Sequence, residues 1–144
     1  MAEEFFVGKK LDFGEIILSE QEIIDFAKQF DPLDFHIDKE AAKKTIFKDL
    51  IASGPHVFNL IYRREWIPRY GKSVICGLGI YNWKFIKPVY ANQKIKAEVT
   101  ISSLKKNERI GGMEVGWYFE FKNEKGEPVQ IVDSGVMHDV SKLG

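Results

Sequence analysis

Several features that define whole classes of protein are missing from this 144-residue sequence. Its one cysteine, Cys76, rules out an internal disulfide framework and lacks the companions of a zinc or iron–sulfur site. No apolar run approaches the length of a membrane span, and the first residues lack the basic and apolar regions of a signal peptide. We therefore expect a cytoplasmic protein that binds no metal and does not enter a membrane.

A net charge of one sign is also lacking. The 21 Lys and Arg residues balance the 21 Asp and Glu residues, so the overall charge gives no reason to expect binding to nucleic acid or to a membrane surface. A local basic patch for a phosphorylated ligand stays compatible with this balance. The length suits one domain with a real core, and no linker or repeat divides the chain. We expect a single domain over residues 1–144.

The first residues predict a strand followed by a helix. Residues 11–18 contain enough branched and aromatic side chains to predict a strand. Ser19 and Glu22 form a capping-box pattern before apolar residues at helical spacing. That helix should end near Asp31, because Pro32 disfavours helical geometry in the residue before it.

The next part of the chain predicts a loop and two further helices. Residues 31–36 should form the loop, and residues 39–44 a short helix. A longer, largely apolar helix should begin at Ser53 or Gly54 and run to about residue 71. In this interpretation Ser53 caps the helix with its hydroxyl group.

The second half of the chain predicts an antiparallel sheet with its strands in meander order. Apolar and polar residues alternate clearly within it, so each strand has one face to cover. The expected strands are 74–89, 94–101, 115–121 and 129–138, with turns at 105–108 and 123–128. The predicted fold class is α+β, with a curved antiparallel sheet wrapped around one central helix.

Three residues suggest chemistry on a carbonyl compound. Asp31 and His36 lie five residues apart and supply a carboxylate and an imidazole, which are suited to moving protons near neutral pH. Gly54 lies at a predicted helix start, where backbone N–H groups point outward and attract negative charge. Each residue also has an ordinary structural explanation, as a turn carboxylate, a core histidine and a helix-start glycine.

Four other residues have chemically versatile side chains but carry weaker signals. Ser53 and His56 are candidates for substrate binding, although Ser53 is better explained as a cap, since no Gly-x-Ser-x-Gly elbow surrounds it. His56 is in the first turn of the helix and is more simply a bystander. His138 is expected at the surface, and Cys76 as a small buried apolar residue.

The segment from Phe26 to Asn59 resembles the hydratase motif of MaoC-like dehydratases, a family that includes (R)-specific enoyl-CoA hydratases. The family pattern is Gly-Asp-x-Asn-Pro-x-His, followed by a stretch that ends in glycine. Asp31 and His36 match the catalytic aspartate and histidine at the family spacing, and Gly54 matches the glycine whose N–H serves the oxyanion hole. The resemblance implies a single hotdog domain that forms a homodimer or higher homo-oligomer by joining two sheets.

The motif departs from the family pattern at four positions. Phe30 replaces the glycine, Leu33 the asparagine, Asp34 the proline, and Ser53 the histidine that usually precedes Gly54. The residues that match are those that perform the chemistry, whereas the replaced residues mostly shape the loop or the pocket. Asp34 adds a second carboxylate near Asp31.

The resemblance implies a lyase that hydrates an enoyl thioester reversibly, with a coenzyme A thioester as its substrate and no metal or redox cofactor. Acyl chain length, the carrier and the pathway are left open by the sequence. Two alternatives also stay open. One is a hotdog acyl-CoA thioesterase, in which water attacks the carbonyl carbon. The other is a non-catalytic module that binds acyl thioesters or another protein.

Overall fold

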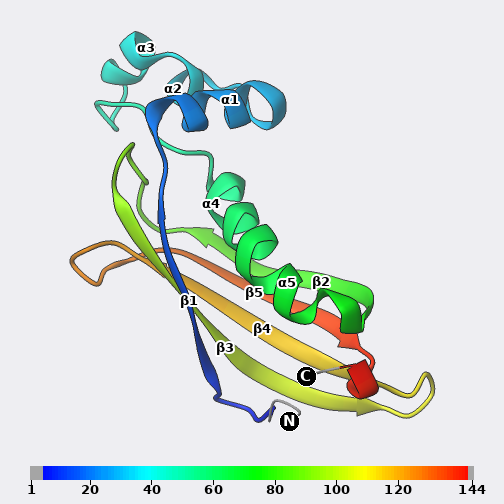
Figure 1. Ribbon diagram of the computed structural model, residues 1–144. Helices are drawn as coiled ribbons and strands as arrows, with labels where there is room; N and C mark the ends of the chain where they lie inside the picture. Colours follow the sequence, from blue (N-terminus) through cyan, green and yellow to red (C-terminus); the bar gives the residue numbers. More distant parts are fainter. Residues whose placement is uncertain (1–4, 143–144) are drawn as a thin grey trace.

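A computed structural model of the protein describes residues 5–142. A five-stranded antiparallel sheet curves around one long helical segment, and three short helices lie above one end of that segment (Figure 1). This is the predicted α+β hotdog architecture. The strands are β1 (Lys10–Ile17), β2 (Val74–Phe85), β3 (Lys94–Asn107), β4 (Gly112–Lys122) and β5 (Pro128–His138).

The helices follow the predicted order along the chain. Those above the sheet are α1 (Glu20–Phe30), α2 (Asp34–Ile37) and α3 (Lys39–Lys43). The long segment consists of α4 (Gly54–Ile61), a π-helical turn (Tyr62–Trp66), α5 (Ile67–Tyr70) and a 3₁₀ turn (Gly71–Ser73). A last 3₁₀ turn covers Val140–Lys142. The predicted single helix up to residue 71 is therefore interrupted by a turn with i→i+5 hydrogen bonding.

The sheet order is β1-β3-β4-β5-β2, so the predicted four-strand meander was wrong for one strand. β3, β4 and β5 are successive neighbours, but β2 pairs with β5 and forms an edge. The turn predicted at 105–108 was also misplaced, because β3 continues to Asn107 and pairs with Gly112. The chain turns just beyond, where Gly111 adopts a φ of +68°, a conformation that glycine tolerates best.

The long helical segment lies along the inner face of the sheet and supplies the core (Figure 1). Val57 and Ile61 of α4 are fully buried. The Phe58 ring contacts Trp83 on β2 and Phe119 on β4, with ring centres 5.4 and 5.0 Å apart. Because these aromatic contacts tie α4 to both an edge strand and a central strand, they fix where the start of α4 lies over the sheet.

Two predictions of burial were wrong. His138, expected at the surface, is fully buried at the end of β5, where it contacts Ser73 and Trp117. Cys76, expected to be buried, is exposed because it lies on the edge strand β2. Burial at this end of the sheet depends on the pairing of β2 with β5 and on the turn at Ser73, and both β2 and Ser73 lie far from His138 in the chain.

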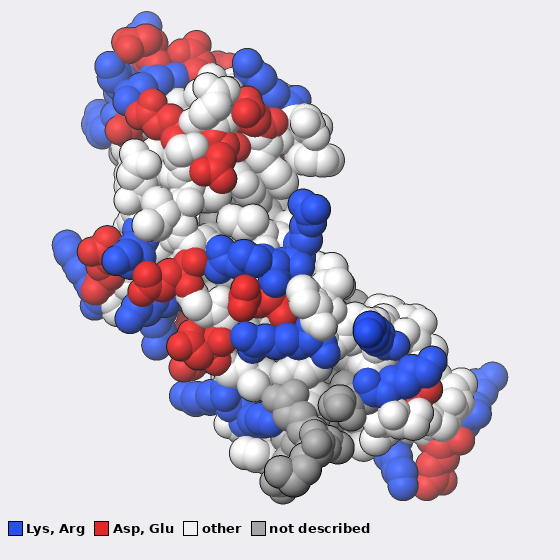
Figure 2. Space-filling view, viewed as in Figure 1, with Lys and Arg blue, Asp and Glu red and all other residues white. Residues whose placement is uncertain are grey.

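The outer surface does not present one dominant charge. Figure 2 shows Lys and Arg interleaved with Asp and Glu on the face in view. Among residues 5–142, no helix is both long and apolar enough to cross a membrane. The edge strand β2 is the main apolar feature of the surface. Its exposed apolar residues are Ile75, Leu78, Ile80, Tyr81 and Phe85.

Candidate active site

The end of α1 places Asp31 above the start of α4. The predicted capping box is present, since Ser19 Oγ accepts from the Glu22 N–H and Glu22 accepts from the Ser19 N–H. At the other end of α1, the Asp31 N–H donates to the Ala27 carbonyl, and the chain leaves helical geometry before Pro32. The carboxylate is therefore held at a helix end and is about 30% exposed.

His36 faces Asp31 from α2. The predicted loop over 31–36 is partly helical, because α2 begins at Asp34, just after the restriction imposed by Pro32. His36 Nε2 lies 3.3 Å from Asp31 Oδ2, and its side chain is only 6% exposed. His36 Nδ1 lies 2.6 Å from the Ile51 carbonyl oxygen. Because a carbonyl oxygen only accepts, Nδ1 carries a hydrogen, and Nε2 is the nitrogen free to exchange a proton beside the carboxylate.

Ser53 does not cap α4 with its side chain, so that prediction was wrong. Its hydroxyl group is fully buried and donates to Asp31 Oδ2 over 2.7 Å. The hydroxyl donates to the carboxylate because a hydrogen bond to a charged acceptor is stronger than a neutral one, whereas at the helix start its oxygen would accept from a neutral N–H. Oδ2 is thus fixed by Ser53 and faced by His36, whereas Oδ1 has no hydrogen-bond partner among the described residues.

Gly54 begins α4, as predicted, and its backbone N–H is one of the unpaired donors of the helix start. No acceptor for it is present within residues 5–142. The preceding segment is pinned from two sides, since the Ile51 N–H donates to the Phe35 carbonyl and the Ala52 N–H donates to the Val89 carbonyl. These bonds fix the Gly54 N–H relative to His36.

The Phe85 ring lies directly against Gly54. A Cβ atom built on Gly54 would approach the ring to 2.2 Å, which is far inside van der Waals contact. The position therefore requires a residue without a side chain, unless Phe85 moves. The sequence predicted Gly54 from its place at a helix start, and the structure adds this second reason for glycine.

Asp31, His36 and Gly54 line one cavity of about 370 Å³. Its other walls are largely apolar, and Lys87 and Gln130 are the further polar residues in its lining. The apolar lining residues are Leu33, Phe35, Phe47, Ile51, Ala52, Pro55, Val57, Phe85, Ile86, Pro88 and Val89. The cavity thus combines two groups that transfer protons with an unpaired N–H donor in a poorly hydrated space.

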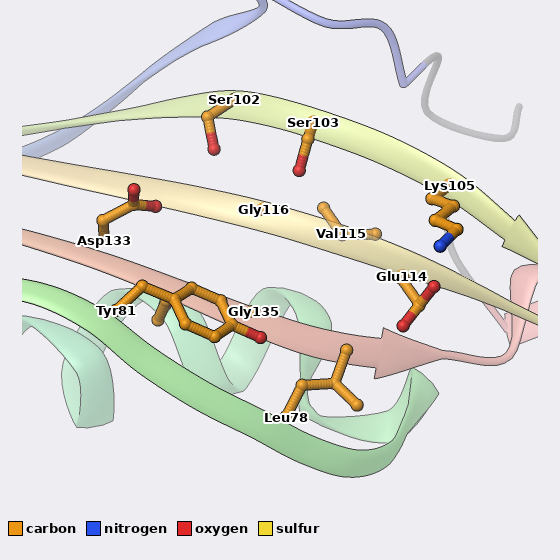
Figure 3. Close-up of a pocket in the computed structure, with 11 residues that line it drawn as sticks. Leu78, Tyr81, Ser102, Ser103, Lys105, Glu114, Val115, Gly116, Asp133 and Gly135 are labelled. Atoms are coloured by element: carbon orange, nitrogen blue, oxygen red, sulfur yellow. The ribbon is translucent and has the colours of Figure 1, made fainter.

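A second hollow, of about 430 Å³, lies on the other face of the sheet. Figure 3 shows its side chains on β2 to β5, with the helical segment behind the strands. Polar residues of its lining include Tyr81, Ser102, Ser103, Lys105, Glu114 and Asp133. Among the described residues that line it there is no histidine, and the Asp31 cavity is therefore the better candidate for acid–base chemistry.

Residues 4–117 match the family model described as "MaoC like domain". The chain belongs to the MaoC-like family. A Bacillus subtilis relative, the uncharacterized protein YdeM, is 34% identical over 110 residues, which cover 74% of this chain and 77% of YdeM.

Two solved structures extend the similarity to the fold. A MaoC-like dehydratase from Rhodospirillum rubrum is 25% identical with a TM-score of 0.82, and the match covers 93% of this chain and 92% of that one. The (R)-hydratase PhaJ1 from Pseudomonas aeruginosa is 25% identical with a TM-score of 0.73, over 94% of this chain and 83% of that one. Membership of the family supports a hydratase or dehydratase role in general terms.

One predicted site residue of this MaoC-like domain lies apart from the others. His56 is not part of the cavity lining and stacks on Phe26 of α1, with ring centres 4.2 Å apart. Burial lowers the pKa of His56, while the charge of Glu22 acts in the opposite direction. Within the described part of the chain, no group of three or more His, Cys, Asp and Glu side chains could hold a metal ion.

Three contributors to the site were missed from the sequence. The Ile51 carbonyl oxygen orients His36, Phe85 covers Gly54, and Gln130 lines the cavity from β5. A backbone carbonyl leaves no signal in a sequence. Gln130 did leave one, because it is a polar residue at an inward-facing position in the apolar series around Val132.

Proposed function

We propose that the protein catalyses the reversible hydration of an enoyl thioester carried on coenzyme A. The observation that carries this proposal is the meeting of Asp31, His36 and the unpaired Gly54 N–H in one cavity. The reaction adds the oxygen of water to the β-carbon and a proton to the α-carbon. It needs a base, a proton donor and an oxyanion site, and no cofactor beyond the thioester itself.

In this scheme the Gly54 N–H donates to the thioester carbonyl oxygen, where negative charge develops as an enolate forms. The helix N-terminus adds the favourable end of the α4 dipole at the same place. The thioester then lies with its double bond towards Asp31 and His36, because all three groups line the same cavity.

Asp31 and His36 divide the proton transfers. Asp31 Oδ1, which has no partner among residues 5–142, orients a water molecule and removes its proton as the water attacks the β-carbon. His36 Nε2 accepts from the same water and relays the proton that the water loses to Asp31 on to the α-carbon, so one water adds across the double bond and both residues end unchanged. No covalent intermediate is required, so the use of the Ser53 hydroxyl as a donor to Asp31 fits the scheme.

The working protein is proposed to be a homodimer joined along β2. β2 is an edge strand with five exposed apolar residues, and an unpaired edge of this kind invites pairing with another strand. A second copy that adds its own β2 would continue the sheet and cover these residues.

The test is hydration of crotonyl-CoA, followed by loss of enoyl absorbance, with release of free thiol measured in parallel. Asp31→Asn and His36→Ala should each lower turnover by about 10²–10⁴-fold, the range typical of general acid–base groups. Asp34→Asn is the matched control, since Asp34 is an exposed carboxylate on α2 that does not line the cavity.

Three results would refute the assignment. Near-normal turnover in the Asp31 or His36 variant would remove the proposed chemistry. Thiol release that is faster than hydration would favour the thioesterase. Binding of thioesters without either reaction would favour a non-catalytic module.

A further inference from the structure

Gln130 is one of two polar cavity residues that the proposed reaction does not use; the other, Lys87, is paired with Glu127. It lies on β5, opposite Phe85 of β2 and Phe121 of β4, and is only 2% exposed. Its side chain points to the inner face of the sheet, towards the helices, where most of its neighbours are apolar. A buried amide in such surroundings is unfavourable unless its donors and acceptor find partners.

The orientation of this amide is fixed by Trp83. The Trp83 Nε1–H donates to Gln130 Oε1 over 2.9 Å. Because an indole nitrogen only donates, the atom facing it must be the amide oxygen, and the amide nitrogen must point elsewhere. Trp83 is itself held by ring contacts with Phe58 and Phe85, so the amide cannot easily turn over.

The amide nitrogen of Gln130 has no hydrogen-bond partner among residues 5–142. In that range the fully enclosed side-chain atoms without a partner are His56 Nδ1 and Trp66 Nε1. Gln130 Nε2 is therefore unpaired but not enclosed, and it retains contact with open space. Since Gln130 lines the cavity of Asp31 and His36, that space is the cavity.

We propose that Gln130 selects substrates whose acyl group carries a hydrogen-bond acceptor beyond the reacting double bond, such as a carbonyl oxygen. This inference rests on the proposed hydratase function. Gly54, Asp31 and His36 are assigned to the thioester carbonyl and to carbons 2 and 3, so the donor on β5 is left for a later part of the acyl group. An alkyl chain would leave the amide N–H groups without a partner, and such a site discriminates strongly against it.

The test compares acyl-CoA ligands that lack the reactive double bond and differ in one group. In 4-oxopentanoyl-CoA a carbonyl oxygen takes the place of one methyl group of 4-methylpentanoyl-CoA, which is of similar size but has no acceptor there. The pair 5-oxohexanoyl-CoA and 5-methylhexanoyl-CoA moves the oxygen one carbon further. Dissociation constants are measured by calorimetry. Wild-type protein should bind the oxo ligand of at least one pair about tenfold more tightly than its alkyl partner.

Two variants isolate the amide nitrogen. Gln130→Glu keeps an oxygen for the Trp83 N–H but replaces the donor with an acceptor, so the preference for the oxo ligand should vanish or reverse. Ser134→Ala is the control, because it removes another polar group from the same face of β5 without altering the cavity lining. This variant should keep the wild-type preference. Circular dichroism spectra verify that both variants are folded.

Crotonyl-CoA hydration by the wild type is measured on the same samples. If crotonyl-CoA is hydrated but neither pair shows a preference, the inference about Gln130 is wrong and the proposed function stands. A preference that survives in Gln130→Glu also overturns the inference. If the protein neither hydrates crotonyl-CoA nor binds any of the four ligands, the proposed function itself fails.

Discussion

His138 should make the fold sensitive to acid. It is fully buried, and the Trp117 Nε1–H donates to its Nε2 over 3.1 Å. On the other side its Nδ1 lies 2.7 Å from Ser73 Oγ, whose own hydrogen goes to the Tyr70 carbonyl. Nδ1 is therefore the protonated nitrogen, and Nε2 must stay unprotonated to accept from Trp117.

Protonation of His138 would place a charge in a buried site. The new Nε2–H would also face the Trp117 Nε1–H, so that two donors would oppose each other. Burial lowers its pKa to about 4, from an ordinary value near 6.5. The unfolded chain therefore binds the proton more readily than the folded protein. Because the pKa of His138 is lower in the folded protein than in the unfolded chain, the folded state has its full stability above pH 6.5. It loses stability as the pH falls from 6.5 towards 4.

The magnitude follows from these two pKa values. Between pH 8 and pH 5, proton uptake by His138 in the unfolded chain should lower the free energy of unfolding by about 2 kcal/mol. The full separation of about 2.5 pKa units corresponds to about 3 kcal/mol, which is reached below pH 4. Against a typical total of about 5–15 kcal/mol, such a loss is large.

The assay is urea unfolding at fixed protein concentration at pH 8 and at pH 5, for the wild type and for His138→Gln. The variant cannot titrate at this position, so its stability should fall about 2 kcal/mol less over that range than that of the wild type. A constant loss of stability in the variant does not affect the comparison, because only the difference between the two pH values is used. Parallel pH dependences in the two proteins would refute this account of the His138 site.

Further variants test the roles of the residues around the cavity and of the sheet edge. Ser53→Ala should lower crotonyl-CoA turnover about tenfold with little change in melting temperature. The hydrogen bond to the charged Asp31 is worth about 1.5–3 kcal/mol, but because it is already made in the resting enzyme, only part of this energy affects the barrier to reaction. Gly54→Val should lower turnover about 10²–10³-fold and also lower the melting temperature. Adding Phe85→Ala to this variant should restore the melting temperature but not the turnover. Recovery of both would exclude an oxyanion role for the Gly54 N–H. Light scattering at micromolar concentration should give a dimer mass for the wild type and a monomer mass for Ile80→Lys, which places a charge on the exposed edge of β2. A monomer mass for the wild type would count against the β2 interface.

Local signals in the sequence predicted most of the fold. The capping box at Ser19, the stop at Pro32 and the start of α4 at Gly54 all lie where the sequence placed them, because each depends on residues within one helical turn. The place of β2 in the sheet could not be predicted in this way. It depends on the pairing of β2 with β5, whose residues are about fifty positions away in the chain.

The same distinction explains the errors at single residues. Cys76 and His138 lie at the same end of the β2–β5 ladder, where Cys76 pairs with Met137 and His138 pairs with Val74, yet Cys76 is exposed and His138 is fully buried. The usual behaviour of a free cysteine as a small apolar residue favoured burial for Cys76, and a position near the C-terminus with no visible partner favoured exposure for His138. The outcome was decided instead by the helical turn at Ser73, which covers His138 and leaves the outer edge of β2 open.

Residue type and spacing were sufficient to nominate Asp31 and His36, because both side chains are held on adjacent short elements. They were not sufficient for Ser53, whose hydroxyl had two possible partners. The N–H donors of a helix start and the carboxylate of a residue 22 positions earlier in the chain were both possible partners, and the hydrogen bond to the charged carboxylate is the stronger one. The cap prediction failed because the carboxylate is brought to Ser53 by tertiary structure. Tertiary structure also decides the role of Gln130, which lies between Trp83 and the cavity. Its amide oxygen accepts from Trp83, and its amide nitrogen is left for a ligand.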